Sequence, residues 1–165
     1  MVTKKKTSRV NTITNWMLVI SIISIVISSY LLYLHYANTE SFCDFSKGLS
    51  CDIVNKSVYS EFPPGSGIPV SLMGIITFLI VIVSIQRIKH NKTIRIGKTN
   101  IDKKILSTFI FYLMLVSLLF ALYLVYTELF LILSICILCV VLDIFIIIML
   151  ILSYKLRGAI YGKTH

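Results

Sequence analysis

Polar residues are scarce in this chain. Of its 165 residues, 57% are hydrophobic, and the mean hydropathy is +0.91, whereas soluble domains are usually about 45–50% apolar. An ordinary soluble domain is therefore excluded, and the composition predicts an integral membrane protein. Short segments in which apolar and polar residues alternate are also lacking, which excludes a membrane-spanning β-barrel.

Long apolar runs are what the chain has instead. A helix needs about 20 largely apolar residues to cross a bilayer, and four stretches meet that requirement: 16–36, 69–88, 105–126 and 129–154. Short connections between them favour an up-and-down bundle. We expect an all-α four-transmembrane-helix bundle in one domain that spans residues 1–165, with an outer loop over 37–68.

A cleavable leader is not expected. Basic residues precede the first apolar run, as in a secretory signal peptide. However, this run is about twice the usual 7–15 residues, and no Ala-x-Ala cleavage site follows it. We interpret it as an uncleaved first helix.

The basic residues are unevenly distributed among the connecting segments. Four precede the first helix, seven lie between Arg87 and Lys104, three follow the fourth helix, and only Lys47 and Lys56 lie in the first loop. This positive-inside pattern predicts a multi-pass plasma membrane protein with both termini cytoplasmic and the cysteine loop extracytoplasmic. Attraction to the anionic lipid bilayer is a sufficient role for the net charge of +9, so nucleic acid is not an expected partner.

The outer loop contains signals for a turn and for a short helix. Residues 62–67 (Phe-Pro-Pro-Gly-Ser-Gly) are a strong turn signal, and Pro69 suits the first turn of the second helix. Before this turn, apolar residues recur with a loose helical period at Ile53, Val54, Val58, Tyr59 and Phe62. A short amphipathic helix is expected to lie on the mouth of the bundle.

The four cysteines form two pairs of different character. Cys43 and Cys51 lie in the polar outer loop, on the oxidising side, where a disulfide persists. Cys136 and Cys139 lie in the fourth apolar run, roughly 10–15 Å from its outer end at a rise of about 1.5 Å per residue. Residues three apart on a helix have Cβ atoms about 5–6 Å apart, so a bond within this inner pair would need distortion and would exchange readily.

Other interpretations of the cysteines remain open. The outer pair is consistent with a structural disulfide, and the inner pair is consistent with two small buried apolar side chains. A zinc site built from all four thiolates is disfavoured, because half of its ligands would lie inside the bilayer, and no metal is expected. The presence of both pairs together favours a relay that leads electrons from a soluble protein to a lipid-dissolved acceptor.

Several polar residues are weaker candidates. Asp143 lies one turn beyond Cys139, near the middle of the bilayer, where an acid is usually functional or paired. A neutral acid hydrogen-bonded to Ser or Tyr of another helix is an equally good interpretation. Ser57 follows the outer pair and is either exposed or directed toward the bundle mouth. His35 and Glu128, the latter in the short turn between the third and fourth helices, are expected to be solvated at the outer interface.

These residues occur in a characteristic order along the chain. The order is Cys43-(seven residues)-Cys51, then Ser57, then Gly-Ile-Pro-Val-Ser-Leu-Met-Gly over 67–74, and finally Cys136-Ile137-Leu138-Cys139. This arrangement resembles the vitamin K epoxide reductase family over nearly the whole chain. The resemblance implies a four-helix bundle around a quinone pocket, which the loop and its short helix cap.

The resemblance also implies roles for individual residues. In this family the inner pair, here Cys136 and Cys139, is the active centre, with Cys139 facing the quinone. The outer pair passes electrons inward, and Cys51 is implied as the partner of Cys136 in an interloop disulfide. Ser57 matches a Ser/Thr position near the active centre.

Two positions depart from the vertebrate pattern of this family. Vertebrate members carry an asparagine where this chain has Val70 and a tyrosine where it has Asp143, and both of those groups hold vitamin K oxygens. Together with Ser57, these positions are the candidates for quinone binding. Prokaryotic members resemble disulfide-generating enzymes, and because no fused thioredoxin domain is expected here, the implied partner is a separate thioredoxin-like (DsbA-like) protein.

The expected function is that of an enzyme, a quinone-dependent thiol–disulfide oxidoreductase. It would generate disulfides in its partner and pass the electrons through both cysteine pairs to a membrane quinone such as ubiquinone or menaquinone. One alternative is a reductase whose main output is reduced quinone or vitamin K (epoxide). A second alternative is a non-enzymatic membrane scaffold with a structural disulfide.

Overall fold

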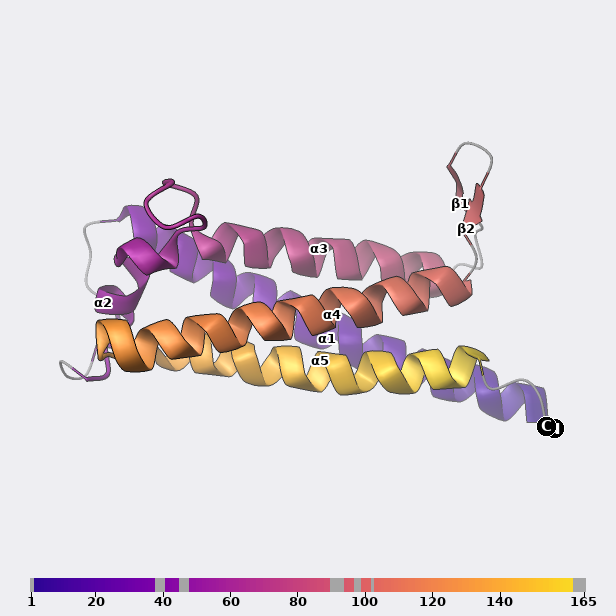
Figure 1. Cartoon of the computed structure of the whole chain (residues 1–165). Coiled ribbons are helices and arrows are strands. Elements are labelled where there is room, and N and C mark those ends of the chain that lie inside the picture. The colour runs from indigo at the N-terminus through magenta and orange to yellow at the C-terminus, as the bar shows by residue number, and fades with distance from the viewer. Residues whose placement is uncertain are drawn as a thin grey trace.

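Four long helices dominate the computed structural model (Figure 1). The structure describes residues 2–37, 41–44, 48–89, 94–96, 99–101 and 103–161. The long helices are α1 (Val2–Tyr36), α3 (Val70–Lys89), α4 (Lys103–Thr127) and α5 (Ile137–Tyr161). Each is long and apolar enough to cross a membrane, which confirms the predicted all-α transmembrane bundle.

The four helices do not pack equally against one another. α1 lies against α3 and α5, and α4 lies against α5, whereas α3 and α4 make far fewer contacts. Side chains from all four helices line the space that this arrangement leaves open. The bundle therefore has a cavity on one side rather than a uniformly filled core.

Small polar residues line the face of α1 that packs on its neighbours. Ser21, Ser24 and Ser28 are buried at the three- and four-residue spacing of one helical face. The hydroxyls of Ser21 and Ser24 donate to carbonyl oxygens four residues earlier, at 2.8 and 2.9 Å, so they are satisfied within their own helix. A Cβ at Gly74 of α3 would lie 3.2 Å from the Ser28 Oγ. Small residues thus let α1 and α3 approach closely, as in other membrane bundles.

Large apolar side chains fill one half of the bundle, here called the hairpin half. At this end α3 and α4 are joined through an antiparallel hairpin of β1 (Ile94–Ile96) and β2 (Thr99–Ile101), which the sequence did not predict. The buried cluster of the hairpin half consists of Met17, Val81, Ile85, Ile88, Ile110, Met114, Met149 and Leu156.

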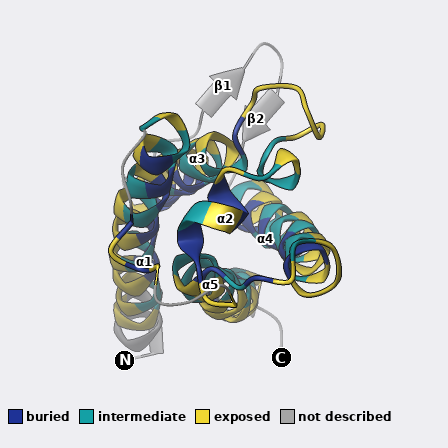
Figure 2. Cartoon of the chain, turned by 90° about the vertical axis from the view of Figure 1, so that its left-hand side faces the viewer, coloured by how far each residue is buried: buried dark blue, intermediate teal, exposed yellow. Residues whose placement is uncertain are grey.

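Two short helices lie at the opposite end, here called the loop half. They are α2 (Cys51–Asn55) and the 3-10 helix η1 (Val58–Ser60), and Figure 2 shows α2 lying across the mouth of the bundle. The prediction of one amphipathic helix through this segment is wrong in its extent. The hydroxyl of Ser57 donates to the Val54 carbonyl oxygen at 2.7 Å, and such a local bond competes with a continuing helix.

The junction of the third and fourth spanning helices also differs from the prediction. α4 continues into a π-helical turn, η2 (Glu128–Ile132), instead of ending near residue 126, and α5 begins at Ile137 instead of residue 129. Leu133, with a φ of 56°, ends η2 in the left-handed conformation. The sequence did not indicate this break, because no Gly or Pro occurs there within the apolar run.

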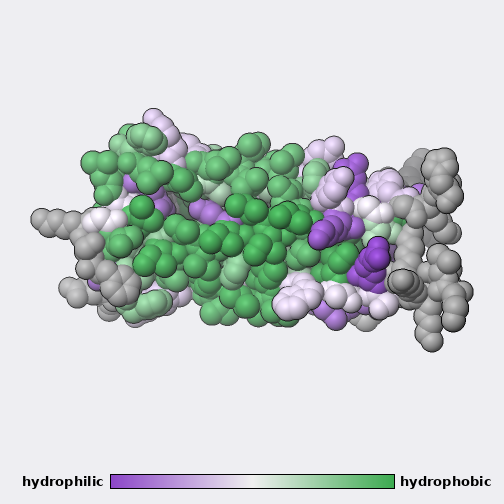
Figure 3. All heavy atoms as spheres, turned by 90° about the horizontal axis from the view of Figure 1, so that it is seen from below, coloured by the Kyte–Doolittle hydropathy of each residue, from purple (hydrophilic) through white to green (hydrophobic). Residues whose placement is uncertain are grey.

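The outer surface of the helices is broadly apolar. Figure 3 shows a hydrophobic band along the bundle, with hydrophilic residues concentrated toward the hairpin end. Exposed side chains such as Val26, Val116 and Leu119 are each 63% accessible. A contiguous apolar surface of this kind belongs against lipid, and the chain is a membrane protein.

Candidate redox site

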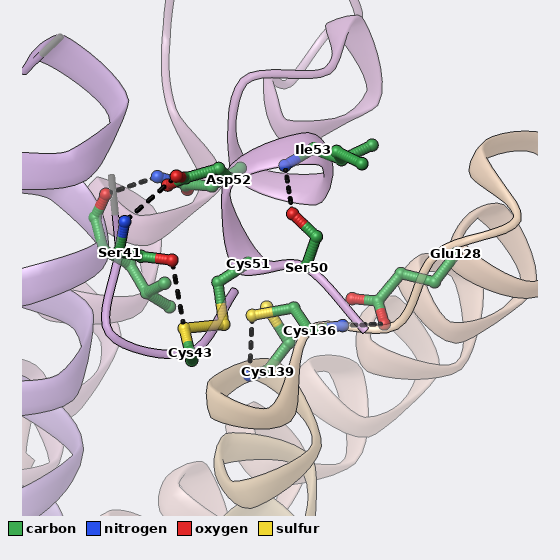
Figure 4. Close-up of a disulfide and its surroundings, with 11 residues drawn as sticks. Ser41, Cys43, Ser50, Cys51, Asp52, Ile53, Glu128, Cys136 and Cys139 are labelled. Carbon is green, nitrogen blue, oxygen red and sulfur yellow. Dashed lines mark hydrogen bonds between the residues drawn. A yellow bond between two sulfur atoms is a disulfide. The ribbon is translucent and has the colours of Figure 1, made fainter. Parts of the chain in front are cut away.

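Cys43 and Cys51 form a disulfide at the mouth of the bundle (Figure 4). Their Cα atoms are 5.8 Å apart, and the two residues are only 2% and 0% exposed. Ser50 caps α2 by accepting a hydrogen bond from the third residue of that helix, so Cys51 begins the helix. The Ser41 amide donates to the Asp52 carboxylate at 3.0 Å. These contacts hold the segment that carries Cys43 against α2.

Cys136 and Cys139 are free thiols at the start of α5. Cys136 precedes the first helical residue, and its sulfur accepts a hydrogen bond from the Cys139 backbone N–H at 3.3 Å. The sulfur therefore lies where a helix presents unpaired amides and the positive end of its dipole. The predicted location of Cys136 well inside the fourth helix is wrong, because α5 begins at Ile137.

The local contacts of Cys136 favour its thiolate form. The hydrogen bond with the Cys139 side chain is the largest influence and lowers the pKa of the Cys136 thiol below its ordinary value, although burial opposes this effect. The Cys139 backbone amide lowers the pKa further. The thiolate is the nucleophile in thiol–disulfide exchange, so Cys136 is suited to that chemistry.

A short backbone pairing brings the two cysteine pairs together. Leu49 and Ile135 form a parallel bridge, in which the Ile135 amide donates to the Gly48 carbonyl oxygen at 3.0 Å. The bridge lies close in sequence to one cysteine of each pair. The resulting buried cluster contains Cys43, Cys51 and Cys136, with Cys139 packed against it, and Figure 4 shows the free sulfur atoms beside the disulfide.

Glu128 is a functional candidate that sequence reasoning missed. Its Oε2 accepts a hydrogen bond from the Cys136 amide at 3.2 Å, and the residue is only 5% exposed. Its carboxylate also interacts with the side chain of Cys139. The prediction that Glu128 is solvated is wrong, because η2 continues the helix and turns this residue inward. The available signal was an acid at the edge of an apolar run, which usually has a function or a partner.

A cavity of about 380 Å³ adjoins the inner thiol pair. This volume is within the range of about 300–1,000 Å³ that is usual for small-molecule sites. All four long helices contribute to its walls, and the segment 54–62 contributes from the loop. Four residues that the sequence singled out lie on its lining: Ser57, Val70, Cys139 and Asp143. Most of the remaining lining is apolar, which suits a lipid-soluble ligand.

Two serine hydroxyls on the cavity lining differ in their hydrogen bonds. The Ser57 hydroxyl already donates to the Val54 carbonyl oxygen, so its proton is engaged. The Ser71 Oγ is buried and has no hydrogen-bond partner in the part of the chain that the structure describes. Because buried hydroxyls are rarely left without a partner, Ser71 is the better donor to a bound ligand.

His35 holds the end of α1 against the loop. Its Nδ1 lies 2.7 Å from the Asn55 carbonyl oxygen, and its Nε2 lies 3.7 Å from a Glu61 carboxylate oxygen. The His35 side chain is only 10% exposed, so the prediction that it is solvated is wrong. The Asn55 side chain also donates to the Leu31 carbonyl oxygen at 2.7 Å. These contacts fix α2 over the cavity.

Side chains that could bind a metal are scattered among the described residues. Over the described ranges, no group of three or more His, Cys, Asp or Glu residues has an arrangement that could hold a metal ion.

Comparison with known proteins agrees with this geometry. The sequence model described as "Vitamin K epoxide reductase family" matches residues 15–154. The matched region includes all four cysteines, the cavity lining and Glu128. A search among curated proteins found no match.

Proposed function

This chain belongs to the vitamin K epoxide reductase family, whose members are membrane oxidoreductases of thiols and quinones, and from that premise we propose a specific reaction. The protein oxidises the thiols of a separate thioredoxin-like protein outside the cytoplasm. It passes the two electrons through its cysteine pairs to a quinone in the membrane.

One observation supports this proposal above all others. A buried disulfide, two free thiols and an apolar cavity follow one another without interruption at the same end of the bundle. Cys139 belongs to both parts of this path, since it packs on the sulfur cluster and lines the cavity. A scaffold with a structural disulfide would have no need for this continuity.

The first steps are thiol–disulfide exchanges. A partner thiolate attacks the Cys43–Cys51 disulfide, and the partner's second thiol completes the exchange, so the partner leaves oxidised and both loop cysteines become thiols. Cys51 then loses its proton and attacks Cys136 of an oxidised inner pair, and Cys139 leaves as a thiolate that takes up this proton. Cys43 resolves the bond between Cys51 and Cys136 and restores the outer disulfide.

The last step transfers the electrons to the quinone. The inner dithiol loses two electrons and two protons and forms its disulfide, while the quinone gains both and becomes a quinol. In the proposed cycle, a bonded outer pair together with two free inner thiols, the pairing in the structure, is the state that precedes electron transfer to the quinone.

Access to the outer disulfide requires movement of the loop. Both loop cysteines are buried, while Phe42 beside them is 69% exposed. The segment 41–44 must therefore shift before a protein thiol can reach the sulfur atoms. A partner that contacts Phe42 would be well placed to cause this shift.

The cavity residues favour an ordinary quinone over an epoxide as substrate. We assign Ser57, Val70 and Asp143 to quinone binding and add Ser71, whose hydroxyl is unengaged. Val70 presents only methyl groups, so this wall packs on the ring or its isoprenoid tail and donates no hydrogen bond. Reduced quinone or vitamin K epoxide as the main output is thereby the less favoured alternative.

The proposed orientation follows from charge. Basic side chains occur near the hairpin ends of the helices, among them Arg87, Lys89, Lys104 and Arg157. Under the positive-inside rule this end lies in the cytoplasm, and the cysteine loop lies outside a plasma membrane. The outer disulfide then faces an oxidising compartment.

Replacement of Cys139 tests the proposal. In the full chain, Cys139→Ala should lower the rate of quinone reduction by more than about 1,000-fold, because the residue that delivers the electrons is lost. The measurement is absorbance of a water-soluble ubiquinone analogue, in lipid nanodiscs supplied with a reduced thioredoxin-like protein.

The matched control is Val140→Ala, on the same turn of α5 at a residue that is 39% exposed. This variant should retain the wild-type rate. Undiminished quinone reduction by Cys139→Ala would reject the proposed electron path.

A further inference from the structure

We infer that Glu128 carries a proton from the Cys139 thiol to the quinone. The inference rests on the proposed function and extends it to a residue outside the four cysteines. It arises from the location of Glu128, whose carboxyl group lies where the inner thiol pair meets the cavity.

The Glu128 carboxylate is held in place by the reactive pair itself. Its Oε2 accepts the Cys136 amide hydrogen bond at 3.2 Å, and the π-helical turn η2 directs the side chain inward. One carboxylate oxygen is thus held by the backbone of the reactive pair. The same side chain interacts with the Cys139 side chain and lines the cavity.

Glu128 is buried, so it is not a solvated surface acid. The residue is 5% exposed, and it lies close to two thiols and within electrostatic reach of Asp143. A buried carboxylate that serves only as a hydrogen-bond acceptor could be replaced by a neutral amide at little cost, because an amide oxygen accepts the same bond. An amide cannot carry a proton, however. Replacement of Glu128 by Gln therefore distinguishes a proton carrier from a simple hydrogen-bond acceptor.

The chemistry of the quinone step requires a proton carrier. Cys139 must lose its thiol proton before its sulfur can deliver an electron pair, and the reduced quinone oxygen must gain a proton as negative charge develops there. The Glu128 carboxylate takes the proton from Cys139 and becomes a carboxylic acid. It then gives that proton to the quinone oxygen and returns to its original form.

The reaction balances with this carrier. The second proton leaves the Cys136 thiol when its sulfur bonds to that of Cys139, and it goes to the other quinone oxygen. In sum, two thiols and one quinone become one disulfide and one quinol, and Glu128 is unchanged. General acid–base catalysis of this kind is typically worth about 100- to 10,000-fold in rate.

Glu128→Gln tests the inference, because the glutamine oxygen can still accept the Cys136 amide bond but carries no proton. The full chain in lipid nanodiscs is first reduced at the inner pair, then mixed with the water-soluble ubiquinone analogue in a stopped-flow instrument. We expect single-turnover quinone reduction to slow by at least about 100-fold, with the KM for quinone nearly unchanged. Glu128→Asp, which keeps a carboxyl group, should recover part of the lost rate.

A separate measurement distinguishes this inference from the proposed function. Reduction of the Cys43–Cys51 disulfide by dithiothreitol needs no quinone, so Glu128→Gln should match the wild type within about 2-fold in that exchange. Leu129→Ala, at the next residue of η2, which is 46% exposed and does not line the cavity, is the matched control and should leave both rates unchanged. Failure of the wild type to reduce quinone would refute the function, whereas equal rates for wild type and Glu128→Gln would refute only the proton carrier.

If Glu128→Gln does not fold, a measurement on the wild type tests whether Glu128 carries the proton. Infrared difference spectra during quinone reduction should show a transient carboxylic-acid C=O band that shifts in heavy water and changes frequency in Glu128→Asp. The absence of that band in turning-over wild-type protein would overturn the inference.

Discussion

The hairpin half and the loop half of the bundle are built from different kinds of residue. The buried apolar cluster of the hairpin half consists of aliphatic residues and Met from all four long helices. The polar residues buried in this half are small Ser and Thr side chains, such as Thr14, Ser107 and Ser153, whose hydroxyls bond within their own helices. The cluster of the loop half contains only Leu31 and Val54 besides three cysteines, and buried polar residues such as Ser50, Asn55 and Glu128 surround it.

The difference shows that the two halves have separate roles: the hairpin half holds the helices together, and the loop half contains the reactive groups. Close apolar packing in the hairpin half fixes the helices relative to one another. In the loop half, all four long helices and the segment 54–62 leave a cavity between them. A reactive site needs space and polar groups, and the second half provides both because the first half supplies the packing.

The largest expected effect is a disulfide between the two cysteine pairs. A chain with Cys43→Ala and Cys139→Ala retains Cys51 and Cys136, which share one buried cluster. Mild oxidation should join them in nearly every molecule, because no large movement is needed to bring the sulfur atoms together. Mass spectrometry of the linked peptides measures the yield.

The control for this experiment moves one thiol into the hairpin half. In a chain with Cys43→Ala, Cys136→Ala, Cys139→Ala and Met149→Cys, Cys51 and the new thiol are the two that remain. No bond should form between them, since Met149 belongs to the other cluster. Equal disulfide yields from the two chains would mean that Cys51 reaches position 149 as readily as Cys136, which would contradict the division into two halves.

An intermediate effect is expected from the packing of the hairpin half. Ile110 is fully buried there, and Ile110→Ala should lower the free energy of unfolding by about 2 kcal/mol. This is the low end of the usual range for such a change, because van der Waals packing rather than removal from water stabilises helices within lipid. Reversible unfolding by dodecyl sulfate in mixed micelles measures the change.

Turnover per folded molecule should be retained in Ile110→Ala, because the cavity and thiols lie in the other half. Leu119→Ala, at a residue that is 63% exposed, is the matched control and should change stability by less than about 0.5 kcal/mol. A large loss of turnover with unchanged stability in Ile110→Ala would mean that the two halves are not separable.

The smallest effect is expected at Ser71. Its unpartnered hydroxyl lines the cavity, and a neutral hydrogen bond to a quinone oxygen is worth about 0.5–1.5 kcal/mol. Ser71→Ala should therefore raise the KM for the quinone analogue about 2- to 10-fold and leave kcat nearly unchanged. Steady-state kinetics over a range of quinone concentrations would show this, and an unchanged KM would exclude Ser71 from the quinone site.

The sequence predicted the four spanning helices, the two cysteine pairs and the family, because each depends on local features. Apolar run length identifies a spanning helix without knowledge of its neighbours, and the order of the cysteines can be read directly. The sequence did not predict the break at Leu133, because no Gly or Pro accompanies its left-handed conformation. Through that one error, Cys136 was expected inside a helix and Glu128 in a solvated turn.

The amino-acid sequence by itself determined that this is an integral membrane protein, that it crosses the membrane with four helices and that it carries two thiol pairs of different character. These properties follow from hydropathy and spacing along the chain. Only the tertiary structure decided that Cys136 caps α5, that Glu128 turns inward onto it and that a cavity opens beside Cys139. Those features depend on where a helix stops and which helices stand apart, and both are set by contacts between residues distant in sequence.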